Sequence, residues 1–184
     1  MVRIALAFAA TFFVTASAFA QHAQPYGGLQ LRPVKALSNE QIADLRAGRG
    51  MELALAAELN GYPGPSHVIE LADALALTNA QRERAQALFA AMKAETVPLG
   101  EALIAAETDL DRQFAARSIT PASLSAATDA IGTAQGRLRA AHLKYHLAML
   151  EALTPEQVKR YGELRGYANA APTGHTPGMH HRMK

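Results

Sequence analysis

Two histidines and one methionine lie close together between Leu138 and Gln157, and all three are side-chain types that bind metal ions. If this stretch is helical, His142, His146 and Met149 occupy positions i, i+4 and i+7, within a sector of about 60° at roughly 100° per residue. Neutral imidazole binds zinc, copper, nickel and cobalt, while the soft thioether favours cuprous ion. Because residues four apart lie one above the other on a helix, His142 and His146 can chelate one ion.

The same side chains also fit a purely structural role. Histidines at a helix interface can act as hydrogen-bonded packing residues, and methionine readily fills irregular gaps in a core. The residue types and their spacing leave both interpretations open.

A second group of candidate ligands lies near the end of the chain. The segment 175–183 reads HTPGMHHRM and contains His175, His180 and His181. Short histidine-rich tracts bind metals by composition alone. Proline and glycine punctuate residues 169–184, so we expect this tail to be disordered and its affinity for an ion to be modest, because closing it costs chain entropy. It is either a loading or scavenging arm or a solvated tail with no role.

The elements that must position the first group are marked by a repeated helix-start motif. The sequence LTNAQ at 77–81 and the sequence LTPEQ at 153–157 each place a threonine at the N-cap and a glutamine at N3, as in a capping box. These residues are Thr78 and Gln81 in the first copy and Thr154 and Gln157 in the second. Each copy therefore predicts the start of a helix.

Apolar periodicity between the motifs predicts two long helices. From Asn79 to about Arg117, apolar residues recur three, four and seven apart, close to a coiled-coil heptad. They are Ala85, Leu88, Met92, Leu99, Leu103, Leu110 and Phe114. After Thr120-Pro121 restarts the chain, the matching residues are Leu124, Ile131, Leu138 and Tyr145. We therefore expect an all-α fold built on an antiparallel hairpin, kinked at Pro98.

Shorter helices are expected on either side of the hairpin, completing a helical domain over residues 37–168. They are predicted from Ser38 to Ala47, from Met51 to Leu59, from an N-cap at Ser66 to the first motif, and from the second motif to about Tyr167. Residues 21–36 contain proline and glycine without helical periodicity, so they are expected to form a flexible arm.

The first 20 residues have the features of a secretory signal peptide. Arg3 precedes an apolar run, and Ala18-Phe19-Ala20 forms an A-x-A cleavage site, so cleavage is expected after Ala20. This predicts export to the periplasm, with an uncleaved anchor as the alternative. The chain has no cysteine, which excludes disulfides and thiolate metal sites.

Two L-T-x-x-Q copies in an exported helical chain resemble the LTxxQ superfamily of periplasmic proteins. That group includes the Spy and CpxP stress chaperones, the zinc-associated ZraP proteins and the CnrX-type metal sensors, and the resemblance spans about Ser38 to Tyr167. CnrX-type sensors bind metal through the helices that precede their two motifs. The resemblance therefore implies a site that joins His67 to His142, His146 and Met149. This sequence departs from the pattern in offering Glu70 or Asp73 where the sensors have a second histidine, and in placing His146 one residue from the expected position.

The resemblance implies an envelope-stress or heavy-metal-response protein that binds zinc, copper, nickel or cobalt without an organic cofactor. The alternative is an ATP-independent holdase with no specific metal site. Expected partners are metal ions, unfolded clients or a membrane-bound sensor, and a second copy in a homodimer. Nucleic acid is not expected, because 18 basic residues are interspersed with 16 acidic ones and the net charge is only +2. No catalytic motif is present, so we do not expect an enzyme.

Overall fold

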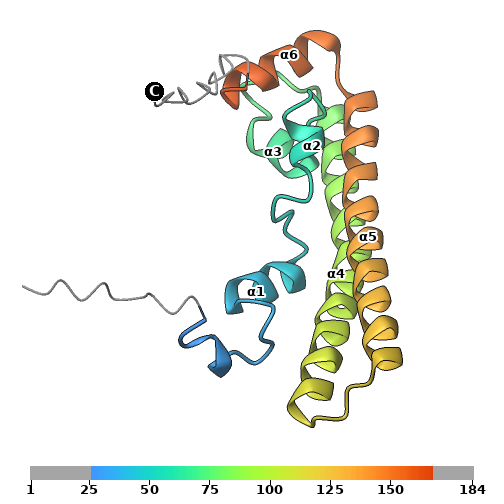
Figure 1. The fold of residues 1–184 in the computed structure, drawn as a ribbon. Helices are drawn as coiled ribbons and strands as arrows, with labels where there is room; N and C mark the ends of the chain where they lie inside the picture. Colours follow the sequence, from blue (N-terminus) through green and yellow to red (C-terminus); the bar gives the residue numbers. More distant parts are fainter. Residues whose placement is uncertain (1–25, 168–184) are drawn as a thin grey trace, which may run out of the picture.

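The computed structural model describes residues 26–167, which form a long antiparallel pair of helices with shorter elements along one side (Figure 1). The elements in chain order are η1 (Leu29–Leu31), α1 (Asn39–Ala47), α2 (Leu55–Glu58), α3 (Pro65–Glu70), α4 (Asn79–Ala115), α5 (Pro121–Ala152) and α6 (Pro155–Leu164). No strand occurs within residues 26–167, so the prediction of an all-α fold is confirmed. The predicted signal peptide and the tail histidines His175, His180 and His181 lie outside the described residues.

Helices α4 and α5 form the expected hairpin. Each begins at a threonine N-cap with a complete capping box, Thr78 with Gln81 and Thr120 with Ser123. Helix α4 continues through Pro98 as one element. Glu95 of α4 links the pair by accepting hydrogen bonds from Lys144 Nζ at 2.7 Å and from the Tyr145 hydroxyl at 2.9 Å on α5.

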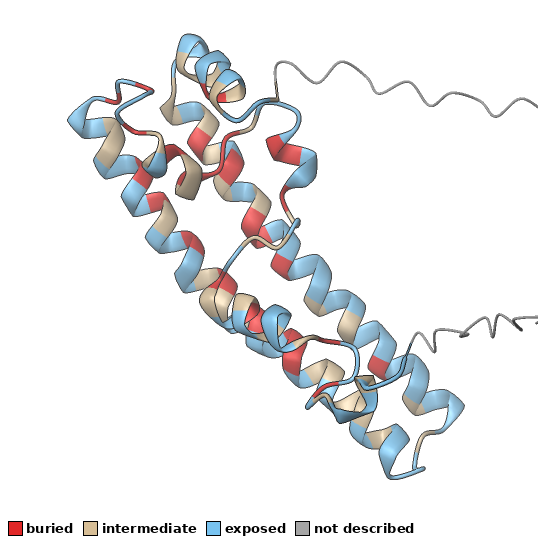
Figure 2. Cartoon of the chain, turned by 90° about the vertical axis from the view of Figure 1, so that its left-hand side faces the viewer, coloured by how far each residue is buried: buried red, intermediate tan, exposed pale blue. Residues whose placement is uncertain are grey.

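The apolar seam of the hairpin is buried only where other elements cover it. Leu88, Leu103 and Leu138 are buried, whereas Phe114 and Leu124 near the connection are 53% and 39% exposed. Figure 2 shows the same trend, since the tip of the hairpin is mostly exposed. The periodicity predicts Phe114 and Leu124 as buried seam residues, whereas in the structure both are exposed.

Two apolar clusters hold the short elements against the hairpin. The first, at the end where α6 lies, contains Val68, Ala72, Leu75, Leu77, Ala85, Leu88, Met149 and Tyr161. The second, farther along the hairpin, contains Val34, Leu37, Leu45, Leu103, Ile104 and Leu138. Gly100 allows α1 to pack closely in the second cluster, because a Cβ there would lie 2.7 Å from the carbonyl oxygen of Leu45.

The segment before α1 differs from the flexible arm expected for residues 21–36. Residues 29–31 form a 3₁₀ turn, and Val34 is only 4% exposed because it packs in the second cluster. Lys35 also pairs with Asp111 of α4 at 3.1 Å. Apolar contacts and an ion pair therefore fix residues 26–36 on the hairpin without helical periodicity.

Helix α2 begins later in the chain than expected, and helix α3 begins earlier. Helix α2 covers only Leu55–Glu58, because Met51 and Glu52 adopt positive φ angles of 40° and 64° that interrupt a right-handed helix. Helix α3 begins at Pro65 with Gly64 as its N-cap, so Ser66 lies inside the helix. Proline at the first helical position supplies a suitable φ angle and lacks only an N–H that would have no intrahelical partner.

None of the helices in the described part of the chain combines the length and the hydropathy that a transmembrane segment requires.

Candidate metal centre

The two LTxxQ motifs, residues 77–81 and 153–157, meet in space and fix the helices that precede them. Both capping boxes form as predicted, and the Gln81 side-chain amide also donates to the backbone carbonyl of Ala152, at 3.0 Å. The Gln157 amide donates to the carbonyl of Leu75 at 3.3 Å. Each glutamine thus ties its own helix start to the chain that precedes the other motif. This arrangement positions α3, which carries His67, beside the end of α5, which carries His142 and His146.

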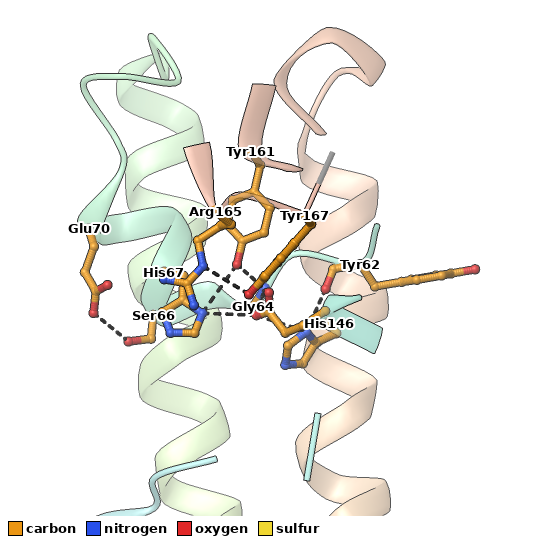
Figure 3. A network of polar contacts seen from close by, with 10 residues as sticks. Tyr62, Gly64, Ser66, His67, Glu70, His146, Tyr161, Arg165 and Tyr167 are labelled. Atoms are coloured by element: carbon orange, nitrogen blue, oxygen red, sulfur yellow. Dashed lines mark hydrogen bonds and ion pairs between the residues drawn. The ribbon is translucent and has the colours of Figure 1, made fainter. Parts of the chain in front are cut away.

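Glu58 of α2 is the centre of a buried polar network, and its partners His67, His146 and Tyr161 are labelled in Figure 3. The residue is only 6% exposed. Its Oε1 accepts hydrogen bonds from the backbone N–H of Gly64 and from His67 Nδ1, each at 3.1 Å, and its Oε2 accepts one from the Tyr161 hydroxyl at 2.7 Å. Burial opposes ionisation, but these hydrogen bonds and the nearby histidines hold the pKa of Glu58 below its usual value. Glu58 is therefore an ionised carboxylate.

The contact with Glu58 determines which nitrogen of His67 remains available. A carboxylate only accepts, so Nδ1 of His67 carries the proton and a neutral ring keeps its lone pair on Nε2. Tyr161 remains a donor to Glu58, because burial and the neighbouring carboxylate raise the pKa of its hydroxyl far above the usual value.

His146 is held in the same way. It is 2% exposed, and its Nδ1 donates to the backbone carbonyl oxygen of Tyr62 at 2.9 Å. Because a carbonyl oxygen has no proton to give, Nδ1 is the protonated nitrogen and Nε2 bears the lone pair of the neutral ring. Figure 3 shows His146 pointing from α5 towards the loop that contains Tyr62 and Gly64.

His142 differs from the other two histidines because neither of its ring nitrogens has a hydrogen-bond partner within residues 26–167. Its ring centroid lies 5.5 Å from that of His146, one helical turn away. Burial first, and the neighbouring His146 second, lower the pKa of His142 to about 4. At neutral pH its imidazole is therefore uncharged and has a lone pair available to an ion.

All three imidazoles line one cavity of about 560 Å³, which we call the histidine cavity. Besides His67, His142 and His146, the residues that line it include Glu58, Met51 and Met92. Two glycines allow the backbone to approach the rings. A Cβ on Gly50 would lie 2.9 Å from His142 Nε2, and a Cβ on Gly64 would lie 2.7 Å from His146 Cε1.

Residues 53–160 match the family model described as heavy-metal resistance. The chain belongs to the heavy-metal resistance family. This membership confirms the resemblance to LTxxQ, Spy-like and CpxP-like proteins. Comparisons with curated proteins and with solved structures gave no match.

The region matched to the heavy-metal resistance family contains the candidate residues that the structure brings together. His67, His142 and His146 share the cavity as the resemblance implied, and Glu70 also lines it. Asp73, the other residue considered in place of a second histidine, pairs instead with Arg82 at 2.7 Å. Within residues 26–167 no three histidine, aspartate or glutamate side chains are grouped closely enough to hold one ion, so ligation by these residues stays a prediction.

Met149 and Glu58 are placed differently from what the sequence indicated. Met149 has no exposed surface, packs in the first apolar cluster and does not line the histidine cavity. The sequence alone does not indicate Glu58 as a residue of the site, although Glu58 contacts two of the three histidines. A single glutamate in a short helix gives no periodic signal, and only the folded arrangement reveals its burial.

Proposed function

We propose that this chain is a periplasmic heavy-metal-response protein that binds a metal ion reversibly in the histidine cavity, without catalysing a reaction. The observation that carries the proposal is the presence of His67, His142 and His146 in one cavity, each able to present an unprotonated nitrogen. Membership of the heavy-metal resistance family supports the same conclusion.

The partners of the ring nitrogens favour ligation over simple packing. Histidines that bind metals usually donate their other ring N–H to a carboxylate or a backbone carbonyl, which fixes the tautomer and the ring orientation. His67 donates to Glu58 and His146 donates to the carbonyl of Tyr62. A carboxylate and a backbone carbonyl are two of the groups that usually orient histidine ligands around a bound ion.

The separation of these donors implies that an ion would change the cavity when it binds. His67 of α3 and His146 of α5 both approach Glu58 Oε1, with their Nδ1 atoms at 3.1 and 3.9 Å, and within residues 26–167 they are not grouped closely enough with a third such side chain to hold an ion as they stand. An ion that draws ligands from both α3 and α5 stabilises one relative position of these elements. Such a change is what a metal-responsive protein needs in order to signal to a membrane-bound sensor or to a second copy.

The metal classes that the cavity suits are those that accept imidazole: zinc, copper, nickel and cobalt. His67, His142 and His146 would hold the ion, with Glu58 and the Tyr62 carbonyl orienting the rings. The predicted signal peptide over residues 1–20 supports a periplasmic location, where such ions enter the cell envelope.

A test is to measure the melting temperature of the mature chain with increasing zinc, nickel, cobalt or copper. A ligand that binds only the folded state stabilises it by about 2.7 kcal/mol at 100 times its Kd. We expect the double variant His142→Ala and His146→Ala to lose this shift. The matched control replaces His175, His180 and His181 by alanine and should keep it. If the control loses the shift and the double variant keeps it, the ion binds the tail.

A second candidate function is that of an ATP-independent holdase. Large apolar side chains are exposed along the described hairpin, on α2 and at the C-cap of α2, which favours contact with unfolded clients. They are Leu55, Leu59, Phe114, Leu124 and Leu147, with exposed fractions of 47%, 58%, 53%, 39% and 55%. The test is suppression of client aggregation at near-stoichiometric ratio without nucleotide. Failure with several clients would exclude this activity while leaving metal binding unaffected.

A further inference from the structure

The C-terminal end of α6 forms one wall of the histidine cavity. Arg165, which is the C-cap of this helix, and Tyr167 both line the cavity. Arg165 Nε donates to the Tyr167 hydroxyl at 3.2 Å, and the Tyr167 ring meets that of Tyr161 edge-on, with their centroids 6.5 Å apart. This end of α6 therefore borders the same space as His67 (Figure 3).

One side chain anchors this wall to the rest of the molecule. The start of α6 is held by Gln157, whose amide bonds to the first LTxxQ motif. Farther along, Tyr161 is only 1% exposed and is the only buried residue of the helix. Its ring belongs to the first apolar cluster, against which Leu164 and Tyr167 pack as partly buried neighbours. Because an element with few buried contacts opens locally at a low free energy, the docking of α6 depends mainly on Tyr161.

The hydroxyl of this anchor bonds to the same carboxylate that orients His67. Tyr161 donates to Glu58 Oε2 at 2.7 Å, while His67 Nδ1 donates to Glu58 Oε1 at 3.1 Å. The Tyr161 hydroxyl oxygen also lies 3.3 Å from His67 Nδ1, so the three groups contact one another. Hydrogen bonds to a charged acceptor are stronger than those between neutral groups. Glu58 therefore links the anchor of α6 to a proposed metal ligand.

An ion bound to His67 would restrict the motion of this network. The bound imidazole has a fixed orientation, and the Glu58 carboxylate that accepts from its Nδ1 is fixed with it. The Tyr161 hydroxyl then docks onto an acceptor that is already ordered, so less conformational entropy is lost when α6 closes against the cavity. Only His67 has to contact the ion for this effect, whichever donors complete its coordination.

We propose that Tyr161 is a positioning residue that couples the docking of α6 to occupation of the histidine cavity. A bound ion holds α6 against the cavity, and loss of the ion releases it. This inference rests on the proposed function, since it gives the metal site a means of reporting whether it is occupied. Coupling between two equilibria is reciprocal, so a docked α6 also raises the affinity of the cavity for the ion.

The direct test measures amide hydrogen exchange of the mature chain by mass spectrometry, with zinc ion as the probe. We expect saturating zinc to slow exchange in residues 155–164 by about tenfold, within the usual range of coupling between linked sites. Residues 112–122, at the end of the hairpin farthest from α6 (Figure 1), are the internal reference and should exchange equally with and without zinc. If zinc binds and exchange in α6 is unchanged or faster, the inference is overturned and the histidine site stands. If zinc does not bind, the inference and the proposed zinc site fail together.

Two matched variants separate coupling from simple packing. Tyr161→Phe keeps the ring in the first apolar cluster and removes only the hydroxyl that reaches Glu58. We expect it to bind zinc about fivefold more weakly or worse, the lower end of typical couplings, and zinc should no longer slow exchange in α6. Tyr167→Phe removes a hydroxyl from the same wall that bonds to Arg165, and it should keep both properties.

A purely structural role for Tyr161 gives a different result. Tyr161→Phe would then lower stability while zinc still bound normally and still slowed exchange in α6, and that outcome overturns the inference. If Tyr161→Phe does not fold, the effect of zinc on exchange in the unmutated chain decides the question alone.

Discussion

The side-chain amides of Gln81 and Gln157, 76 residues apart, donate hydrogen bonds to each other across two helix starts. Gln81 Nε2 lies 2.8 Å from Gln157 Oε1, and Gln157 Nε2 lies 3.0 Å from Gln81 Oε1. Each Oε1 also accepts the backbone N–H of its own N-cap threonine at 3.0 Å. The repeated motif is therefore a reciprocal link between two capping boxes as well as two separate helix starts.

The reciprocal link predicts that glutamate is not equivalent to glutamine at position 81. Glutamate still caps the helix by accepting from Thr78, but it cannot donate to Gln157 or to the carbonyl of Ala152. We expect Gln81→Glu to destabilise the fold by about 1–3 kcal/mol, the cost of leaving partly buried acceptors unpaired. Urea unfolding measures this change.

The matched control for that prediction is Gln41→Glu in α1. Gln41 forms the same capping box with Ser38 and has no further side-chain hydrogen bond within residues 26–167. We expect its replacement to change stability by less than about 0.5 kcal/mol, as for most surface substitutions. Equal losses at both positions would mean that Gln81 acts only as a cap.

The sequence predicted the two capping boxes but not their contact. Threonine at the N-cap and glutamine at N3 form a local pattern over four residues, so Thr78 and Gln81 were assigned correctly from the residues alone. The link to Gln157 depends on how α5 returns along α4, which the local pattern does not contain.

The difference between a local sequence pattern and a contact between distant segments also explains which residues of the histidine cavity the sequence predicts. Helical spacing places His142 and His146 on one face, and that face does point inwards. Periodicity does not tell whether the surface opposite is apolar or polar, so it predicts Met92 as a seam residue and gives no signal for Glu58. Met149 satisfied the spacing of a ligand, but its side chain meets the apolar residues of the first cluster.

Tyr161→Phe tests whether Glu58 needs its hydrogen bonds in order to stay ionised. Removing the hydroxyl leaves Glu58 Oε2 without its donor at 2.7 Å, so the pKa of Glu58 should rise and stability should fall by about 1–3 kcal/mol at pH 7. Because the pKa of Glu58 is lowered in the folded state, its contribution to stability is present above the unfolded pKa and is lost as the pH falls. The difference between variant and unmutated chain should therefore shrink in acid.

Thermal unfolding from pH 7 down to pH 3 measures the effect of Tyr161→Phe. Tyr167→Phe is the control, because Tyr167 lines the same cavity but has no hydrogen bond to Glu58. A difference between Tyr161→Phe and the unmutated chain that stays constant with pH would contradict the assignment of the hydroxyl to the Glu58 carboxylate.

His142 should make the metal-free protein less stable in mild acid. Its pKa is about 4 in the folded chain against 6.5 for an ordinary histidine, so the unfolded chain binds more protons between these values. Stability therefore rises with pH across this window and is lost as the pH falls from about 6.5 towards 4. Replacing His142 by glutamine, which does not titrate, should flatten the dependence of melting temperature on pH in this range.

Two exposed glycines in α5 should tolerate alanine with a gain in stability. A Cβ on Gly132 or Gly136 would meet nothing within 4 Å, and glycine in a helix interior costs about 1 kcal/mol relative to alanine. We expect Gly132→Ala and Gly136→Ala to stabilise the fold by up to about 1 kcal/mol each. Gly100→Ala should do the opposite, because its Cβ would meet the carbonyl oxygen of Leu45. Urea unfolding separates these outcomes.

Gly50→Ala tests whether His142 Nε2 is a metal-binding atom, because it acts on that nitrogen without replacing the histidine. The added methyl group would lie 2.9 Å from Nε2 and would occupy the approach of an ion. We expect metal affinity to fall at least tenfold while helical content stays the same, as measured by titration and circular dichroism. Gly162→Ala, whose Cβ would meet nothing within 4 Å, is the control and should bind normally. Unchanged affinity in Gly50→Ala would show that ions reach the chain without using the His142 nitrogen that faces this loop.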